Sequence, residues 1–284
     1  MPATLPTLMP DTAAPATADD TPLDVEALIA PEYERDTYTF DQLEPLYNFQ
    51  KTTPRRAKLL IRMILHELRD RPSPTRVLDI GAGEGIAQSI TYQRVVAQHC
   101  DELWGVEPDE SIERTDNVFH NYQHALLETA DLPESYFDVA YAFMVMEHVQ
   151  DPDAFLSAMA RCLKPGGVFI FMTPNKKHYF SILTSLLKTL RVEEFLLRVL
   201  RGKSEVEDYH YPVAYKCNTP KQIDPVATRL GLEQPRYVFL EGEGPRPYMR
   251  GPLILLFHLF VLKRKLWKNP RVLLTLVGRI RKPD

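Results

Sequence analysis

Cysteine and glycine are scarce in this chain of 284 residues, and no apolar run is long enough to cross a bilayer. The three cysteines, Cys100, Cys162 and Cys217, stand far apart without a C-x-x-C pair. This pattern excludes a disulfide framework and a zinc finger, and it favours a reducing compartment with inert or buried thiols. The longest apolar run, Leu253–Leu262, has about half of the roughly 20 residues that a spanning helix needs. We therefore expect a core, lid or interfacial helix there.

Positive charge is not in excess either. The chain has 34 basic and 38 acidic side chains, a net charge of −4, whereas a protein that neutralises many phosphates is usually basic. We therefore expect no nucleic-acid partner. The charge is nevertheless uneven: residues 1–50 carry ten acids and one base, and residues 251–284 carry eight bases and one acid. The beginning of the chain lacks the basic and apolar parts of a secretory signal, so we expect a cytoplasmic protein with a basic end that can meet a membrane surface.

Apolar runs alternate with amphipathic stretches through the middle of the chain. This alternation predicts an α/β fold with a parallel sheet. The expected strands are Arg76–Ile80, Leu103–Val106, Ala125–Leu127, Phe137–Phe143, Val168–Met172 and Tyr237–Leu240. The expected helices cover residues 24–30, 54–70, 86–98, 151–163 and 179–201, and one more begins at Thr219-Pro220 and ends at Gly231, with Pro225 predicting a late start or a kink.

A glycine cluster follows the first expected strand. The sequence VLDIGAGEG spans residues 77–85, so that Gly81, Gly83 and Gly85 join a strand to a helix. Glycines let the backbone pass close beneath a nucleotide-like ligand, and a helix N-terminus offers free N–H groups. Taken alone, such a turn also fits an ordinary tight connection between a strand and a helix. The acidic side chain of Asp79 at the end of the strand makes the pattern more specific.

Two further carboxylates follow neighbouring strands. Glu107 comes directly after the second strand, where a carboxylate can accept hydrogen bonds from ribose hydroxyls. Asp131 lies in the sequence ADLP after the third strand, where it can take the amino group of adenine. The carboxyl ends of the strands in an open α/β sheet form its ligand-binding edge. The sequence therefore predicts a nucleoside site at this edge.

Together with FDVAYAFMVMEHV and LKPGGVFIFMTPN, these motifs resemble those of class I S-adenosylmethionine-dependent methyltransferases, in the small-molecule branch that includes ubiquinone and menaquinone biosynthesis enzymes. The resemblance covers about residues 55–240. It implies a Rossmann-like seven-stranded sheet with helices on both faces and an antiparallel last strand, S-adenosyl-L-methionine as methyl donor, and a small-molecule acceptor. It also implies roles for matching positions: Asp79, Gly81, Gly83 and Gly85 hold the methionine part and pack beneath the ribose, Glu107 binds the ribose diol, Asp131 and the Leu132 backbone bind adenine, and Ala142 and Phe143 face the methionine carboxylate and the methyl group.

Composition and the resemblance together suggest how the chain is organised. We expect a disordered tail over residues 1–23, a helical cap over 24–72, and a methyltransferase domain over 73–241 that contains a helical lid at 177–215. A basic, apolar helical segment is expected over 242–284.

The sequence departs from its metal-dependent relatives after the fourth strand. Those relatives carry E-x-x-E-H, whereas this chain has Met144 in the first position and Glu147-His148 in the last two. Magnesium prefers oxygen ligands, so we expect no bound metal. Two interpretations of Glu147-His148 stay open: the pair orders the turn into the next helix, or His148 takes a proton from the acceptor. The stretch Lys164–Gly167 is expected to be a structural turn, and Tyr209–Tyr211 either an acceptor-binding loop or a surface strand.

The segments at the edges of the fold have two interpretations as well. The helix at 179–201 and the run Leu253–Leu262 either bury their apolar faces on the body, or cover a lipophilic acceptor or rest on an anionic membrane. On the second interpretation, a chain ending at Gly251 would still bind S-adenosylmethionine.

Three functions are compatible with these patterns. Methyl transfer accounts for all of the motifs and is favoured, and the motifs fit O-, N- and C-methylation equally. An NAD-dependent oxidoreductase would share the glycine turn and Glu107 but would leave Asp79 and Asp131 unexplained. A non-catalytic binding module that keeps the fold is the third possibility, because a fold does not by itself imply a function.

Overall fold

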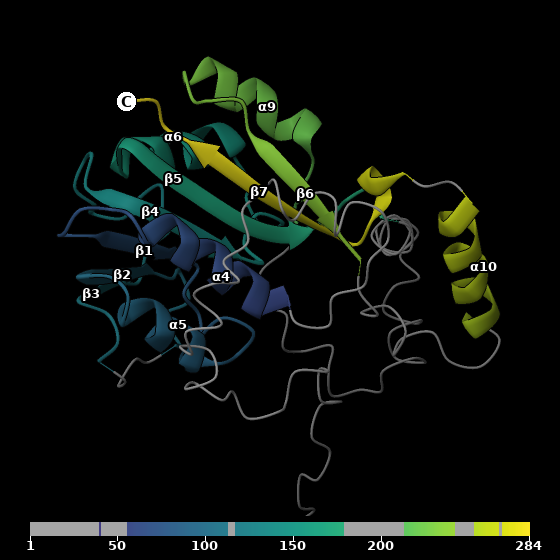
Figure 1. The fold of residues 1–284 in the computed structure, drawn as a ribbon, viewed down its shortest axis with the longest axis horizontal. Coiled ribbons are helices and arrows are strands. Elements are labelled where there is room, and N and C mark those ends of the chain that lie inside the picture. The colour runs from purple at the N-terminus through teal and green to yellow at the C-terminus, as the bar shows by residue number, and fades with distance from the viewer. Residues whose placement is uncertain (1–39, 41–55, 113–116, 179–212, 242–252, 267–268) are drawn as a thin grey trace, which may run out of the picture.

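The computed structural model describes residues 40, 56–112, 117–178, 213–241, 253–266 and 269–284. They form a seven-stranded sheet in the order β3-β2-β1-β4-β5-β7-β6 (Figure 1). Strands β1 to β5 run parallel, and β7 is antiparallel to both of its neighbours, which confirms the expected sheet with an antiparallel last strand. The bounds are β1 Arg76–Ile80, β2 Glu102–Val106, β3 Asn121–Gln123, β4 Phe137–Phe143, β5 Leu163–Pro174, β6 Arg236–Leu240 and β7 Thr275–Arg281.

Helices cover both faces of this sheet, as expected (Figure 1). Helices α4 (Arg56–Leu68) and α5 (Ile90–Ala97) pack on one face, and α6 (Pro152–Cys162) and α9 (Pro220–Arg229) on the other. The buried apolar side chains accordingly fall into two clusters, one containing Leu60 and Tyr141 and the other containing Phe155 and Phe169. Successive strand residues contribute to opposite clusters because side chains alternate along a strand. Outside these layers lie α10 (Leu253–Leu266) and the short 3-10 helix η2 (Pro270–Val272).

Local chemistry explains where these helices begin. Helix α6 starts after Asp151, whose Oδ1 accepts hydrogen bonds from the N–H groups of Asp153 and Ala154 at 3.0 and 3.1 Å. Helix α5 starts four residues later than expected, because Ala87 and Gln88 have φ angles of 53° and 59°, outside the helical region. Helix α9 begins directly at Pro220, so Pro225 inside it does not delay its start.

The expected position of the third strand is wrong. The apolar residues Ala125–Leu127 predict a strand, but β3 is Asn121–Gln123 and the residues that follow it form turns. β3 lies at the edge of the sheet and pairs only with β2, and its three side chains are half-buried. An edge strand of this kind has no apolar run to mark it.

The C-terminal segment is helical only in part, which corrects the expectation for residues 242–284. Helix α10 is present, but β7 follows it and inserts between β5 and β6. Both faces of β7 are covered, so its buried residues do not alternate with polar ones. Gly278 interrupts the run because a Cβ there would collide with the ring of Phe171. A chain ending at Gly251 would lose a strand from inside the sheet, so it cannot serve as a test of cofactor binding.

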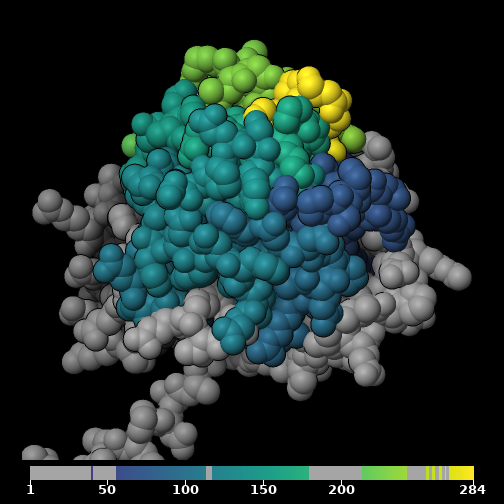
Figure 2. All heavy atoms as spheres, turned by 90° about the vertical axis from the view of Figure 1, so that its left-hand side faces the viewer, coloured from purple at the N-terminus to yellow at the C-terminus, as the bar shows by residue number. Residues whose placement is uncertain are grey.

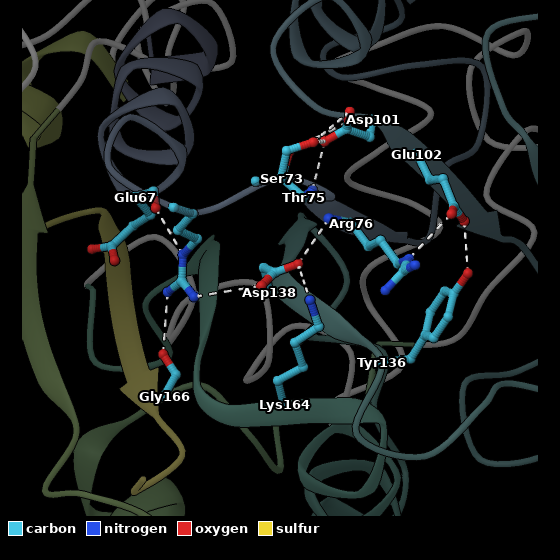
Figure 3. A network of polar contacts seen from close by, with 11 residues as sticks. Glu67, Ser73, Thr75, Arg76, Asp101, Glu102, Tyr136, Asp138, Lys164 and Gly166 are labelled. Carbon is cyan, nitrogen blue, oxygen red and sulfur yellow. Dashed lines mark hydrogen bonds and ion pairs between the residues drawn. The ribbon is translucent and has the colours of Figure 1, made fainter.

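A polar network fastens the amino ends of the strands (Figure 3). The buried Asp138 Oδ2 accepts a hydrogen bond from the Arg76 N–H at 2.8 Å and pairs with Lys164 Nζ at 2.7 Å. Arg71 reaches the other oxygen of Asp138 at 4.0 Å and donates to the carbonyl of Gly166 at 3.2 Å. Lys164–Gly167 therefore has a structural role, as expected, although β5 already begins at Leu163. Because this network occupies the amino edge of the sheet, the carboxyl edge is the side at which a ligand is expected.

Helix α4 and strand β7 lie side by side although more than 200 residues separate their contacts. Arg279 Nε pairs with Glu67 Oε1 at 2.7 Å, and Arg56 Nη1 donates to Thr275 Oγ1 at 3.0 Å. Figure 2 shows the blue atoms of α4 close to the yellow C-terminal atoms. The expected tail, the helices at 24–30 and 179–201, and Tyr209–Tyr211 lie outside the described residues.

Candidate active site

The glycine turn bends sharply over the end of β2. The N–H groups of Gly81 and Ala82 both donate to the carbonyl of Val106, at 2.8 and 3.1 Å. Gly81 has a φ of +72°, which favours glycine, and a Cβ there would collide with the side chain of Val145. The turn therefore brings the loop after β1 against the loop after β4, at the point where the strand order reverses. In open α/β sheets this switch point is where ligands bind.

The carboxylate of Glu107 faces the glycine turn. Its Oε2 accepts the N–H of Gly83 at 2.9 Å, and its Oε1 accepts the N–H of Asp109 at 3.0 Å. The side chain is 7% exposed. A carboxylate offers about four lone-pair positions, so about two remain for other donors. A Cβ at Gly83 would lie 3.6 Å from Oε2, so glycine keeps the space in front of the carboxylate open.

Asp79 is buried at the end of β1 and is tied to α5. Gln93 Nε2 donates to Asp79 Oδ2 at 2.5 Å and to the carbonyl of Ala82 at 2.9 Å, so one amide holds both the acid and the glycine turn. Gln93 Oε1 is buried and has no hydrogen-bond partner within the described part of the chain. Sequence reasoning missed Gln93, although a glutamine among the apolar residues of a short helix is a signal that could have found it.

Asp131 is positioned by a second glutamine that the sequence analysis missed. Gln123, the last residue of β3, accepts the Asp131 N–H through Oε1 and donates to the Asp131 carbonyl through Nε2, both at 2.9 Å. The carboxylate of Asp131 is exposed, whereas the next residue, Leu132, is buried. Arg161 fixes the carbonyl of Leu132 with a hydrogen bond of 2.9 Å. Gln123 thus holds the acidic loop in place without restraining the acid itself.

The end of β4 turns abruptly toward the site. Ala142 is fully buried inside the sheet, paired with Ile80 on one side and Phe171 on the other. Phe143 and Met144 are half-buried. Met144 has a φ of 57°, an unusual value for a long side chain, and its N–H donates to the Met172 carbonyl at 2.8 Å. Strained backbone of this kind is frequent at functional sites.

Glu147 is buried below this turn. Its Oε2 accepts a hydrogen bond from Thr173 Oγ1 at 2.9 Å, and its backbone carbonyl accepts the N–H groups of Ala214 and Tyr215 at 2.7 and 3.0 Å. Burial raises the pKa of Glu147 to about 7, and the positive charge of Arg56 opposes this rise. Glu147 therefore joins the loop after β4 to β5 and to the chain that leads into α9. The turn into α6 is ordered instead by Asp151, as described above.

Further buried polar groups surround Glu147, and sequence reasoning did not single them out. Asn218 Nδ2 donates to Thr173 Oγ1 at 2.6 Å. Burial lowers the pKa of the Arg56 guanidinium, which Glu147 and Glu241 partly offset. Glu241 Oε1, directly after β6, lies 3.9 Å from Nε2 of the buried His178. Such residues sit outside any motif, and only the folded sheet brings them together.

Residues 50–217 match the family of methyltransferase domains. The chain belongs to this family. It is 32% identical over 117 residues to a probable S-adenosylmethionine-dependent methyltransferase of Mycolicibacterium smegmatis, covering 40% of this chain and 44% of that protein. It is 29% identical over 145 residues to a ubiquinone biosynthesis O-methyltransferase of Idiomarina loihiensis, covering 48% and 56%. The chain thus spans about half the length of the curated relatives it matches.

A solved structure shows the same fold. The phosphoethanolamine N-methyltransferase 2 of Haemonchus contortus, in complex with S-adenosyl-L-methionine, aligns with a TM-score of 0.51 and 15% identity, covering 92% of this chain and 60% of that one. Family membership and fold together confirm the resemblance inferred from the motifs of this methyltransferase domain.

The structure brings most of the expected residues of the methyltransferase domain to one edge. Gly81, Gly83 and Glu107 are in one hydrogen-bonded unit, and Asp79 joins it through Gln93. Gly85 also has a positive φ, of 115°. His148 is half-buried in the turn after β4, where its N–H donates to the Val145 carbonyl at 2.9 Å. The roles of these residues remain predictions.

Neither a metal-ligand cluster nor a low-pKa thiol is found among the described residues of this domain. Within the described residues, no group of three His, Cys, Asp or Glu side chains is arranged to hold a metal ion, and the absence of a metal requirement remains a prediction. Burial raises the pKa of Cys162 to about 11 and that of Cys100 and Cys217 to about 12. Such thiols are poor nucleophiles at neutral pH, as expected.

Proposed function

We propose that this chain transfers a methyl group from S-adenosyl-L-methionine to a small, lipophilic acceptor. The observation that carries the proposal is the carboxylate of Glu107, which faces the glycine turn with Gly83 N–H at 2.9 Å and has acceptor positions to spare. A nucleoside with a free ribose diol offers two hydroxyl donors, which match those positions.

The other residues of this edge fit the remaining parts of the same ligand. The exposed carboxylate of Asp131 can accept the adenine amino group, with Gln123 holding its backbone. The buried Oε1 of Gln93 is an acceptor that suits the ammonium group of the methionine part. S-adenosyl-L-methionine, when bound, supplies an electrophilic sulfonium methyl group. The protein's contribution is to align the acceptor and exclude water.

The loop after β4 is the proposed methyl side of the site. Phe143 and Met144 are half-buried there and shield the reacting centre from water. His148 lies four residues further on, and its imidazole takes the proton of an acceptor hydroxyl or ammonium group. Buried Glu147 fixes this loop through its hydrogen bond from Thr173.

A lipophilic acceptor is favoured by two observations. The Idiomarina relative is named for ubiquinone biosynthesis, and the described part of this chain has apolar side chains exposed on α10. A lipophilic acceptor would bring the protein to a membrane surface, and α10 supplies a face for that contact.

The test separates catalysis from binding. Full-length protein is titrated calorimetrically with S-adenosylmethionine and with NADH, and S-adenosylhomocysteine release is then measured with a panel of phenols, catechols and amines of increasing chain length. The proposal expects binding of S-adenosylmethionine, no binding of NADH, and turnover that increases with acceptor lipophilicity. Binding without turnover on any acceptor would favour a non-catalytic module, and binding of NADH alone would favour the oxidoreductase.

A further inference from the structure

Helix α10 carries a stripe of exposed leucines. Leu255, Leu259, Leu262 and Leu266 are 65%, 54%, 53% and 72% exposed. Their spacing of four, three and four residues places them within about 60° of one another around a helix of 3.6 residues per turn. Among the described residues, five of the six large apolar side chains that are exposed belong to α10, the fifth being Ile254. Contiguous exposed apolar surface usually marks an interaction site.

This helix is too short to cross a bilayer. It has 14 residues, which at 1.5 Å per residue span about 21 Å, against about 30 Å for the hydrocarbon core. Among the described residues no helix is long and apolar enough to span a membrane. An apolar helix of this length, with exposed leucines and with basic residues at its end, suits contact along a surface rather than a span.

The charge of the helix decides between the possible partners. Its sequence, LILLFHLFVLKRKL, has three consecutive bases at Lys263–Lys265 and no acid, and the whole segment 251–284 has eight bases and one acid. A second copy of this chain would bring another helix of the same charge. An anionic lipid surface offers both an apolar layer and the opposite charge, and it attracts basic residues beside an apolar face.

The place of α10 in the fold gives the contact a consequence. Only eight residues separate the end of α10 from Thr275, which begins β7 and pairs with Pro174 at the carboxyl end of β5. Figure 1 shows α10 standing apart from the sheet on that side. The candidate active site lies at the same edge. A lipid surface against α10 would therefore lie at the carboxyl edge of the sheet, the edge that carries the candidate active site.

From this combination we propose that the leucine stripe of α10, defined by Leu255, Leu259, Leu262 and Leu266, docks this protein on an anionic membrane surface. The bases at Lys263–Lys265 supply the electrostatic part of the contact. Docking needs neither cofactor nor acceptor, so it can be tested independently of methyl transfer.

The experiment is a vesicle flotation assay on the full-length protein. One set of vesicles contains phosphatidylcholine alone, and the other equal parts of phosphatidylcholine and phosphatidylglycerol. The wild type is expected to float with the anionic vesicles at low salt, less at physiological salt, and hardly with the neutral ones. Absence of flotation with anionic vesicles at low salt would overturn the proposal, and equal flotation with both sets would overturn its electrostatic part.

Matched variants assign the contact to the stripe. Leu259→Glu is compared with Leu126→Glu, because Leu126 is 52% exposed and Leu259 is 54% exposed, but Leu126 lies beside β3. We expect Leu259→Glu to lower the vesicle partition coefficient about tenfold or more, and Leu126→Glu to leave it near the wild-type value. A Leu259→Glu variant that floats like the wild type would overturn the proposal.

Two further readouts distinguish the competing partners of the stripe. A triple variant, Lys263→Gln/Arg264→Gln/Lys265→Gln, is expected to lose about tenfold or more in partition at low salt.

Thermal melting and size-exclusion chromatography of Leu259→Glu should match the wild type. A large fall in melting temperature would show that the stripe packs on the body of this chain, and conversion of a dimer to a monomer would show that a second copy covers it; either result overturns membrane docking. Calorimetric binding of S-adenosylmethionine is recorded for the same samples, so a failure of docking is distinguishable from a failure of the proposed activity.

Discussion

The hydroxyl of Thr173 donates a hydrogen bond of 2.9 Å to Glu147 Oε2 across the buried space between β5 and the loop after β4. Both side chains are almost fully removed from water. Arg56 contributes a positive charge that interacts with both Glu147 and Glu241. A carboxyl group in this setting holds its proton more strongly than in water, because burial disfavours the ionised form.

The raised pKa of Glu147 predicts how stability depends on pH. Its ordinary value is 4.5 and its value in the folded protein is about 7. The stabilisation that comes from protonated Glu147 is fully present below pH 4.5 and is lost as the pH rises through about 7. The reason is that this carboxyl group ionises at a lower pH in the unfolded chain than in the folded protein. Glu147→Gln keeps an acceptor for Thr173 and removes the titration. Its free energy of unfolding relative to wild type should therefore increase with pH over this window, by on the order of 3 kcal/mol.

Chemical denaturation measures the free energy of unfolding of Glu147→Gln and of the wild type. It is carried out between about pH 4 and 8, with roughly one measurement per half pH unit. Glu134→Gln, an exposed site, is the control and should run parallel to the wild type. Parallel curves for Glu147→Gln as well would contradict the proton-holding role of Glu147.

A second prediction concerns the contact between Gly81 and Val145. Gly81→Ala places a Cβ in the space of the Val145 side chain and forces alanine to a φ of +72°. We expect it to lower the free energy of unfolding by about 2 kcal/mol or more. The double variant Gly81→Ala/Val145→Ala should recover the steric part, so the two effects will not add. Additive losses in urea denaturation would show that the two loops are not in contact.

The glutamine that holds the Asp131 loop gives a third prediction. Gln123→Ala removes two hydrogen bonds to the Asp131 backbone, each contributing about 1 kcal/mol. S-adenosylmethionine affinity should fall about fivefold or more. Asp131→Ala should also weaken binding, but less than a change at Glu107, because the Leu132 backbone remains. Calorimetry that gives wild-type affinity for both variants would remove this loop from the adenine site.

Metal removal gives a fourth prediction. Met144 stands where metal-dependent relatives have a carboxylate, and a thioether is a poor ligand for magnesium. Methyl transfer should therefore persist in EDTA at the untreated rate. Loss of activity that magnesium restores would show that the chain recruits a metal through other groups.

The sequence anticipated the parts of the fold that rest on local patterns. The pattern predicts β1 and β4 with the bounds that the structure shows, since each is a buried apolar run beside turn residues. The pattern does not locate β3, because an edge strand of half-buried polar residues has no such run. The resemblance implies a last antiparallel strand, but no local pattern locates it at β7, because its neighbours β5 and β6 come earlier in the chain and its insertion between them is a long-range feature.

In the candidate site, too, some residues follow from local motifs and others depend on long-range contacts. Gly83 and Glu107 follow from the motif that spans the first two strands, and the structure joins them by a hydrogen bond. Gln93 and Gln123 support the loops from neighbouring elements, and their function depends on long-range contacts that a sequence pattern does not encode. Of the two interpretations of Glu147-His148, ordering of the turn into the next helix does not describe the Glu147 carboxylate, which accepts its hydrogen bond from Thr173 in β5.

The central claim, that Glu107 binds the ribose of S-adenosylmethionine, has a direct test in calorimetry of Glu107→Gln. This variant keeps one oxygen for the backbone N–H groups that Glu107 holds, whereas Glu107→Ala would leave both without their acceptor. Glu102→Gln is the control, because Glu102 lies at the amino end of β2, the strand that Glu107 follows, and accepts hydrogen bonds from Arg76 and Tyr136. We predict that Glu107→Gln weakens S-adenosylmethionine binding roughly 30-fold or more, equivalent to about 2 kcal/mol, and that Glu102→Gln leaves it unchanged. Wild-type affinity in a folded Glu107→Gln variant, or an equal loss in Glu102→Gln, would contradict the account.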